Sequence, residues 1–299
     1  MSNIDIITPL SPTERLPVVR MIGFGDLWEC LSRGLDDFRA MPTQVLFVML
    51  VYPVVGLVLG RFAFGYDIVP LLYPLAAGFA LIGPFAAIGM YELSRRREQG
   101  LDTSWSHMLD VFHSPSLRSI LALGGMLLVL FAFWLVIAQS IYVANFGEAE
   151  PHAPLQFLHS VVTTREGFNL IVLGNLAGLL FAIAAFSLSV ISFPLLLDRN
   201  VGVAVALATS VKAVTTNPLT MAAWGVIVAL VLVVGMLPLF TGLAVAVPIL
   251  GHATWHLYRK VVEPDVRPRP RFEPAEKLPR YAADFPAVLL TLFDRGRKS

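Results

Sequence analysis

Charged residues are scarce in this chain of 299 residues, and long stretches of it contain none. Only 14% of the residues are Asp, Glu, Lys or Arg, whereas 56% are hydrophobic. The charge-free stretches are residues 43–60, 68–91, 119–145, 168–193, 219–236 and 239–258. A soluble helix needs a polar face, and ~18 apolar residues are enough to cross a hydrocarbon core of ~30 Å. The pattern therefore predicts six transmembrane helices rather than a soluble domain.

Several kinds of chemistry lack the residues that they would need. Cys30 is the only cysteine, so an intramolecular disulfide and a cysteine-based metal cluster are excluded. The sequence has no glycine-rich phosphate loop, no nucleophile elbow and no zinc motif of the His-Glu-x-x-His type. Transporters and proton relays usually place ionisable residues inside their spans, and these spans contain no Asp, Glu, Lys or Arg. We therefore lean away from an enzyme, and we predict no cofactor and no nucleic-acid partner.

Basic residues are distributed unevenly between alternate loops. The three loops on one predicted side hold only Arg61 and Arg165, and the segments on the other side hold the remaining 20 of the 22 Lys and Arg residues. Those segments are residues 1–41, 92–118, 198–217 and 259–299. Cytoplasmic loops of membrane proteins are enriched in Lys and Arg, so both termini are expected in the cytoplasm. The expected location is a bacterial inner membrane, with several passes.

These boundaries divide the chain into three predicted regions. Residues 1–41 form a cytoplasmic segment with an amphipathic helix, residues 42–258 form the six-span membrane domain, and residues 259–299 form a cytoplasmic tail rich in Pro and Arg. Residues 219–258 need a break, because a single helix of that length would measure ~60 Å, twice the membrane thickness. The segment from Gly235 to Gly242, which contains Pro238, supplies residues that end helices.

An internal repeat precedes every second span. Near residues 26–40, 104–114 and 202–216, apolar residues recur at spacings of three and four, and a proline follows each segment. In the first copy, polar Arg33, Asp36 and Asp37 lie between the apolar Leu31, Leu35 and Phe38. The predicted fold is therefore an all-α membrane protein built from three hairpins, each preceded by an amphipathic helix on the cytoplasmic surface. Gly174 and Gly178, four residues apart in the fourth span, predict close packing against another helix, more often within the chain than between chains.

Two histidines are the sharpest chemical feature. His252 and His256 are four residues apart, so they share one helix face near the predicted cytoplasmic end of the sixth span. They are weak candidates for a metal or haem pair, with further ligands from His107 or His113. The alternative is that these histidines meet headgroups and water at the membrane boundary.

Three segments resemble a bacterial family of predicted six-span integral membrane proteins, domain of unknown function 2189. They are the Trp28–Phe38 helix, the Gly83–Arg95 segment with its Gly-Pro-Phe start, and the Ser192–Arg199 segment with its Phe-Pro pair. The resemblance covers roughly residues 20–260. Some members are labelled cytochrome c oxidase subunit I. That subunit resembles a twelve-span protein that has several histidines within the membrane. Here only His252 lies near a span interior, so the resemblance implies an architecture and transfers no catalytic residue.

The sequence is consistent with three functional hypotheses. The leading hypothesis is a non-enzymatic scaffold or an accessory subunit of a membrane complex, with the lipid bilayer and other subunits as partners. The second is a transporter or lipid-handling protein with an apolar cavity between the hairpins. The third is a haem- or metal-binding redox protein that uses His252 and His256.

Overall fold

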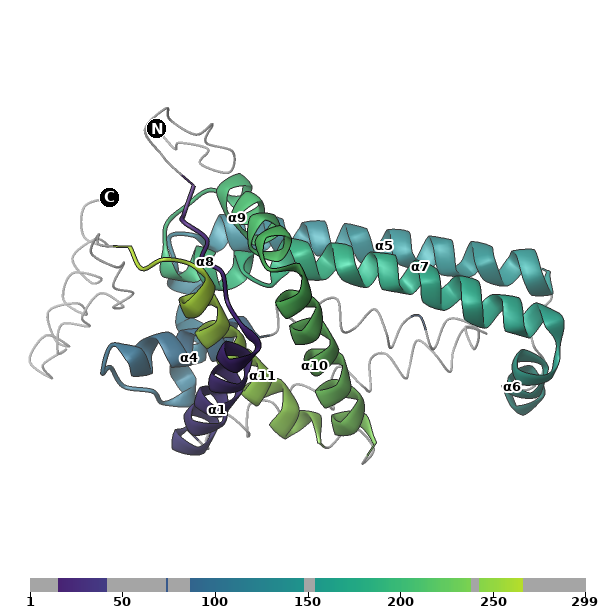
Figure 1. The fold of residues 1–299 in the computed structure, drawn as a ribbon, viewed down its shortest axis with the longest axis horizontal. Helices are drawn as coiled ribbons and strands as arrows, with labels where there is room; N and C mark the ends of the chain where they lie inside the picture. The colour runs from purple at the N-terminus through teal and green to yellow at the C-terminus, as the bar shows by residue number, and fades with distance from the viewer. Residues whose placement is uncertain (1–15, 42–73, 75–86, 148–153, 238–241, 266–299) are drawn as a thin grey trace, which may run out of the picture.

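The chain is mostly helical in the part that the computed structural model describes, which comprises residues 16–41, 74, 87–147, 154–237 and 242–265. In these ranges the only β pairing is an isolated antiparallel bridge between Val19 and Val262. The helices, shown in Figure 1, are α1 (Phe24–Ala40), α4 (Ile88–Glu98), the 3-10 helix η2 (Trp105–His113), α5 (Leu117–Phe146), α6 (Pro154–Thr163), α7 (Arg165–Ser189), α8 (Ser192–Asp198), α9 (Val203–Thr216), α10 (Pro218–Met236) and α11 (Leu243–Val261).

Among the described residues, three apolar stretches of helix are long enough to cross a bilayer: α5, α7 together with α8, and α10. They coincide with the third, fourth and fifth predicted spans. The predicted span 43–60, most of 68–91 and most of the tail 259–299 lie outside the described residues. The sixth predicted span corresponds to α11, which is not among the three because His252, His256, Arg259 and Lys260 make it more polar. Six spans in three hairpins therefore remain a prediction.

Helices α5 and α7 form a long pair that projects away from α1, α4, α8 and α11 (Figure 1). Trp134 of α5 lies against Phe181 of α7, with ring centroids 5.7 Å apart. Gly178 makes room for that indole, since a Cβ placed there would lie 3.2 Å from Trp134, whereas one at Gly174 would meet no atom within 4 Å. Of the two glycines, Gly178 therefore packs within the chain. At the far end Phe157 of α6 stacks edge-on against Phe146.

The predicted break after the fifth span is confirmed. Helix α10 ends at Met236 and α11 begins at Leu243, and the two helices pack against each other. Gly235 and Gly242 allow this close reversal, because a Cβ on Gly242 would lie 2.8 Å from the Gly235 carbonyl oxygen.

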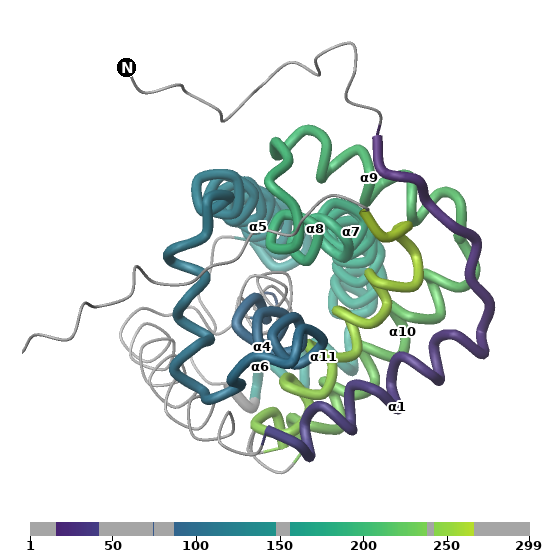
Figure 2. Tube along the Cα trace, turned by 90° about the vertical axis from the view of Figure 1, so that its left-hand side faces the viewer, coloured from purple at the N-terminus to yellow at the C-terminus, as the bar shows by residue number. Residues whose placement is uncertain are grey.

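Helix α1 lies along α11, as Figure 2 shows, although the two are more than 200 residues apart in the sequence. Leu27, Cys30, Gly34 and Asp37 recur at spacings of three and four and form the buried face. At Gly34 the helices approach so closely that a Cβ would lie 2.7 Å from both the Cβ and the backbone nitrogen of Ala253. The expectation that Asp37 belongs to a solvent-facing polar side is wrong, because burial against protein leaves it 4% exposed.

The other two predicted amphipathic segments also form helices with protein neighbours. Helix η2 covers the segment predicted near 104–114 and packs against α4, while α9 covers that near 202–216 and packs against α7 and α8. Buried Met108 and Val111 face inward on η2, as do Ala206 and Ala213 on α9. Their placement on a membrane surface stays a prediction.

The close crossing predicts opposite effects of one substitution at two glycines of α1. Gly34→Ala is expected to lower the free energy of unfolding by about 1–3 kcal/mol, because the added methyl overlaps backbone atoms of α11. Gly25→Ala is the matched control, since its Cβ would meet no atom within 4 Å and alanine favours a helix. Thermal unfolding of both variants in detergent measures the difference. Equal effects at the two positions would contradict the observed packing.

Candidate functional site

Charged and polar side chains gather where α1, α4, η2, α8 and the C-terminal half of α11 meet. We call these five segments the headpiece; they lie at the opposite end of the molecule from α6 (Figure 1). Buried polar groups here include Asp37, Glu92, Arg95, Asp198 and His252. A charge removed from water is costly unless it is paired, so the partners of these groups determine what the headpiece can do.

Asp37 is the centre of the first cluster, and its partners come from two other helices. One carboxylate oxygen, Oδ2, lies 2.9 Å from Nε2 of His256 and accepts a hydrogen bond of 2.5 Å from Ser94 Oγ. The other oxygen pairs with the Arg97 guanidinium. His252 completes the cluster, with its Nδ1 2.7 Å from Ser94 Oγ. Both sequence-predicted histidines therefore lie beside a carboxylate of α1.

The direction of these hydrogen bonds follows from counting protons. Ser94 has one hydroxyl hydrogen, and it is donated to the Asp37 carboxylate, which can only accept. The Nδ1 atom of His252 must then donate to Ser94 Oγ. His252 thus donates to Ser94, Ser94 donates to Asp37, and His256 donates directly to Asp37.

Asp37 stays ionised in this environment. Burial raises the pKa of its carboxyl, but the hydrogen bonds from His256 and Ser94 and the nearby histidine charges outweigh that effect and hold the pKa at about 2. The arrangement stabilises a carboxylate and places it between α4 and α11.

The histidine pair makes contacts other than those expected. His252 is fully buried and His256 is mostly buried, so the expectation that they meet headgroups and water is wrong. His107 contacts Asp110 and Asp102, with nitrogen–oxygen distances of 2.6 and 3.0 Å. In the described part of the chain, no group of three or more His, Cys, Asp or Glu side chains is arranged to hold a metal ion.

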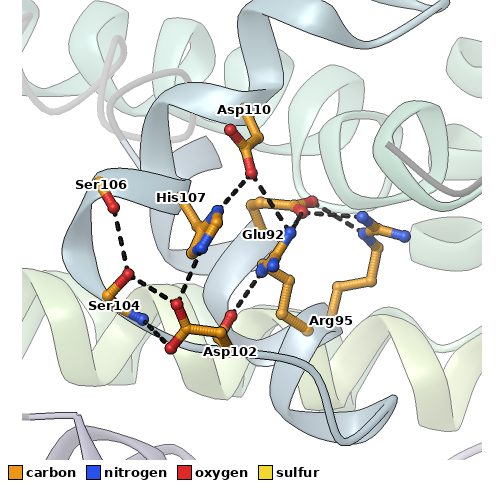
Figure 3. A network of polar contacts seen from close by, with 8 residues as sticks. Glu92, Arg95, Asp102, Ser104, Ser106, His107 and Asp110 are labelled. Atoms are coloured by element: carbon orange, nitrogen blue, oxygen red, sulfur yellow. Dashed lines mark hydrogen bonds and ion pairs between the residues drawn. The ribbon is translucent and has the colours of Figure 1, made fainter. Parts of the chain in front are cut away.

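A second cluster links α4 to η2 and is drawn in Figure 3. Arg95 donates two hydrogen bonds, of 2.8 and 2.7 Å, to the two carboxylate oxygens of Glu92. Arg96 donates to Asp110 at 3.2 Å and to the backbone oxygen of Asp102 at 2.6 Å. These bonds attach the loop after α4 to the helix that precedes it, so η2 is held by charged contacts as well as by Met108.

A third cluster joins α8, α4 and α11. The Tyr258 hydroxyl donates to Asp198 Oδ2 at 2.6 Å. Arg259 donates to Glu98 Oε1 at 2.9 and 3.1 Å, and Trp255 Nε1 donates to the other oxygen of Glu98 at 3.3 Å. Three consecutive turns of α11 therefore contact carboxylates from three different helices, α1, α4 and α8.

Two carboxylates near the N-terminus of α1 bind the last turn of α11. Lys260 Nζ lies 3.1 Å from Asp26 and 2.6 Å from Glu29. Between this pair and the Asp37 cluster, Cys30 is fully buried, and burial raises the pKa of its thiol to about 12. Cys30 is therefore a packing residue held as a neutral thiol.

Sequence reasoning located the histidine pair but missed the acids that they contact. The spacing of His252 and His256 correctly placed both on one helix face. Asp37 was grouped with the exposed polar residues, although its position three residues after Gly34, on the face with Leu27 and Cys30, was a usable signal. Glu92 and Arg95 were recognisable as a possible ion pair from their i,i+3 spacing directly after an apolar stretch.

Substitution of Asp37 tests whether its charge holds the headpiece together. Asp37→Asn removes the negative charge but keeps the side-chain shape, leaving Arg97 and His256 without their counter-ion. We expect the free energy of unfolding to fall by about 2–3 kcal/mol at pH 7 in detergent. Asp36→Asn is the control, since Asp36 is the exposed neighbouring acid. Equal losses in the two variants would contradict the assignment.

The dependence of the free energy of unfolding on acidic pH provides a second test of Asp37. The folded pKa of about 2 lies below the ordinary 3.8, so ionised Asp37 stabilises the fold above about pH 4. That contribution, about 2 kcal/mol, is lost as the pH falls from 4 toward 2. The free energy of unfolding should be measured across this pH range. The Asp37→Asn variant should not show this fall in stability, whereas Asp36→Asn should keep the wild-type profile.

Comparison with known proteins agrees with the membrane character of the fold. Residues 71–198, which include α4, η2 and α5 to α8, match the model of a family described as "Predicted integral membrane protein (DUF2189)". Comparisons with curated proteins and with solved structures gave no match. In the part of the chain that the structure describes, three stretches of helix are long and apolar enough to cross a bilayer. The chain is therefore an integral membrane protein that matches this family of unknown function over residues 71–198.

Proposed function

We propose that the protein is a non-enzymatic scaffold, an accessory subunit that seats another membrane protein against its α5–α7 pair. The observation that carries this proposal is the outer surface of that pair. Along its length large apolar side chains are exposed on both helices: Leu128, Phe133 and Val136 on α5, and Leu176, Leu180 and Ile183 on α7. The pair projects from the headpiece (Figure 1), and these six side chains are 52–69% exposed.

The headpiece supports the proposal by its construction. Its buried charged groups are paired both within a helix, as Arg95 with Glu92 of α4, and across helices, as Asp37 of α1 with Arg97 of α4. Such pairs satisfy groups that would otherwise be costly in the interior. These contacts hold the helices of the headpiece to one another, and α5 and α7 extend from it, as a scaffold requires.

Photo-crosslinking in cells tests the scaffold directly. A photoreactive residue at Leu180, which is 69% exposed, or at Leu176 should yield a discrete protein adduct. The control position is Val233 on α10, which is also exposed but belongs to a different helix and should yield lipid adducts. Leu176→Trp with Leu180→Trp should abolish co-purification of the same partner in mild detergent. Lipid adducts alone at all three positions would contradict the scaffold and favour a lipid-handling role.

The proposed orientation places both termini in the cytoplasm of a bacterial cell, with the headpiece on that side. The asymmetry of Lys and Arg supports it, since these residues concentrate at the headpiece and in the terminal segments. Reporters fused before residue 1 or after residue 299 should therefore signal cytoplasm, and a reporter inserted near residue 152 should signal the periplasm. A periplasmic signal from either terminus would overturn the six-span topology.

A further inference from the structure

Helix α1 has three distinct sides, of which the first is buried against protein and the second faces water. The first side, with Leu27, Cys30, Gly34 and Asp37, is buried against α11. The second, with Gly25, Arg33 and Asp36, is polar and exposed, as expected of a face in water.

The third side is apolar and lies next to the buried one. At 100° per residue, Phe24, Trp28, Leu31, Leu35 and Phe38 fall within a single strip between the other two faces. Trp28 is 76% exposed and Phe24 is 63% exposed, while the remaining three are partly buried. Large aromatic side chains at this level of exposure need a partner other than water.

The position of this strip relative to α10 indicates what that partner is. Ile22, just before α1, donates its backbone N–H to Asn217 at 2.8 Å and accepts a hydrogen bond of 3.1 Å from Thr220. Asn217 is the N-cap of α10, which is apolar and long enough to cross a bilayer. The start of α1 is therefore fixed at the level where α10 enters the membrane. Leu219, in the first turn of α10, is also apolar and is 75% exposed.

Two polar contacts prevent α1 from rolling about its axis. Near its N-terminus, Asp26 and Glu29 bind Lys260 of α11. Near its C-terminus, Asp37 binds Arg97 of α4 and His256 of α11. Because the contacts lie about three turns apart on one side of the helix, they fix which side of α1 faces outward.

We propose that α1 is an interfacial anchor whose apolar strip, led by Phe24 and Trp28, inserts into the cytoplasmic leaflet at the boundary of headgroups and acyl chains. Tryptophan and phenylalanine are the side chains that such interfacial helices use. The anchor holds the headpiece at a fixed depth beside the start of α10. This site is separate from the α5–α7 surface, and it does not depend on the scaffold proposal.

Spin labels on α1 in lipid nanodiscs provide the test, in a Cys30→Ala background that retains wild-type unfolding. Labels at Phe24→Cys and Trp28→Cys report the strip, and labels at Gly25→Cys and Asp36→Cys report the polar side. Collision rates with oxygen, which partitions into lipid, are compared with those of a water-soluble nickel chelate. The expected ratio of oxygen to nickel accessibility is above one at positions 24 and 28 and below one at positions 25 and 36.

Three results would overturn the anchor. A ratio below one at positions 24 and 28 would place the strip in water, and a ratio above one at all four would embed the whole helix. Low accessibility to both reagents at positions 24 and 28 would indicate a protein partner.

Lys260→Gln combined with Asp37→Asn should reduce the contrast between the two sides. An unchanged contrast would show that the polar contacts do not set the rotation of α1.

Discussion

The buried carboxylate of Asp37 is the constraint on which the arrangement of the headpiece depends. It belongs to α1, and its partners belong to α4 and α11, so one charge fixes three helices that are far apart in the sequence. A buried anion without partners would cost several kcal/mol, which means that the helices can pack this closely only while these contacts are made. The close crossing at Gly34, one turn earlier on α1, is possible because glycine has no Cβ there.

The same principle recurs along α11. Its last turns contact Asp37, Glu98, Asp198 and the acids at the start of α1. Away from the headpiece, α5 and α7 instead pack through groups such as Trp134 and Phe181 and expose apolar side chains. Buried charge therefore gathers at one end of the molecule, and the apolar helices lead away from it, with the exposed Arg165 and Glu166 at the far end of α7. This division supports both the proposed orientation and the proposed anchoring of α1.

The sequence was informative where a pattern is local. Helices α5, α7 and α10 follow from uninterrupted apolar length, and α1 and α9 follow from spacings of three and four. The shared face of His252 and His256 also follows from spacing. The role of Asp37 could not be predicted in this way, because a polar residue on an amphipathic helix normally faces water. Ser94 and His256, its partners, lie 57 and 219 residues away, so only the tertiary structure shows which polar side chains meet.

A double-mutant cycle on Asp37 and His256 tests this account most directly. The free energy of unfolding is measured in mixed micelles for wild type, Asp37→Asn, His256→Gln and the variant carrying both. If the two side chains pair across α1 and α11, the double variant loses less stability than the sum of the single losses, with a coupling energy of about 1–3 kcal/mol. Additive losses would show that the residues do not interact, and would contradict the assignment of Asp37 as the group that holds the headpiece together.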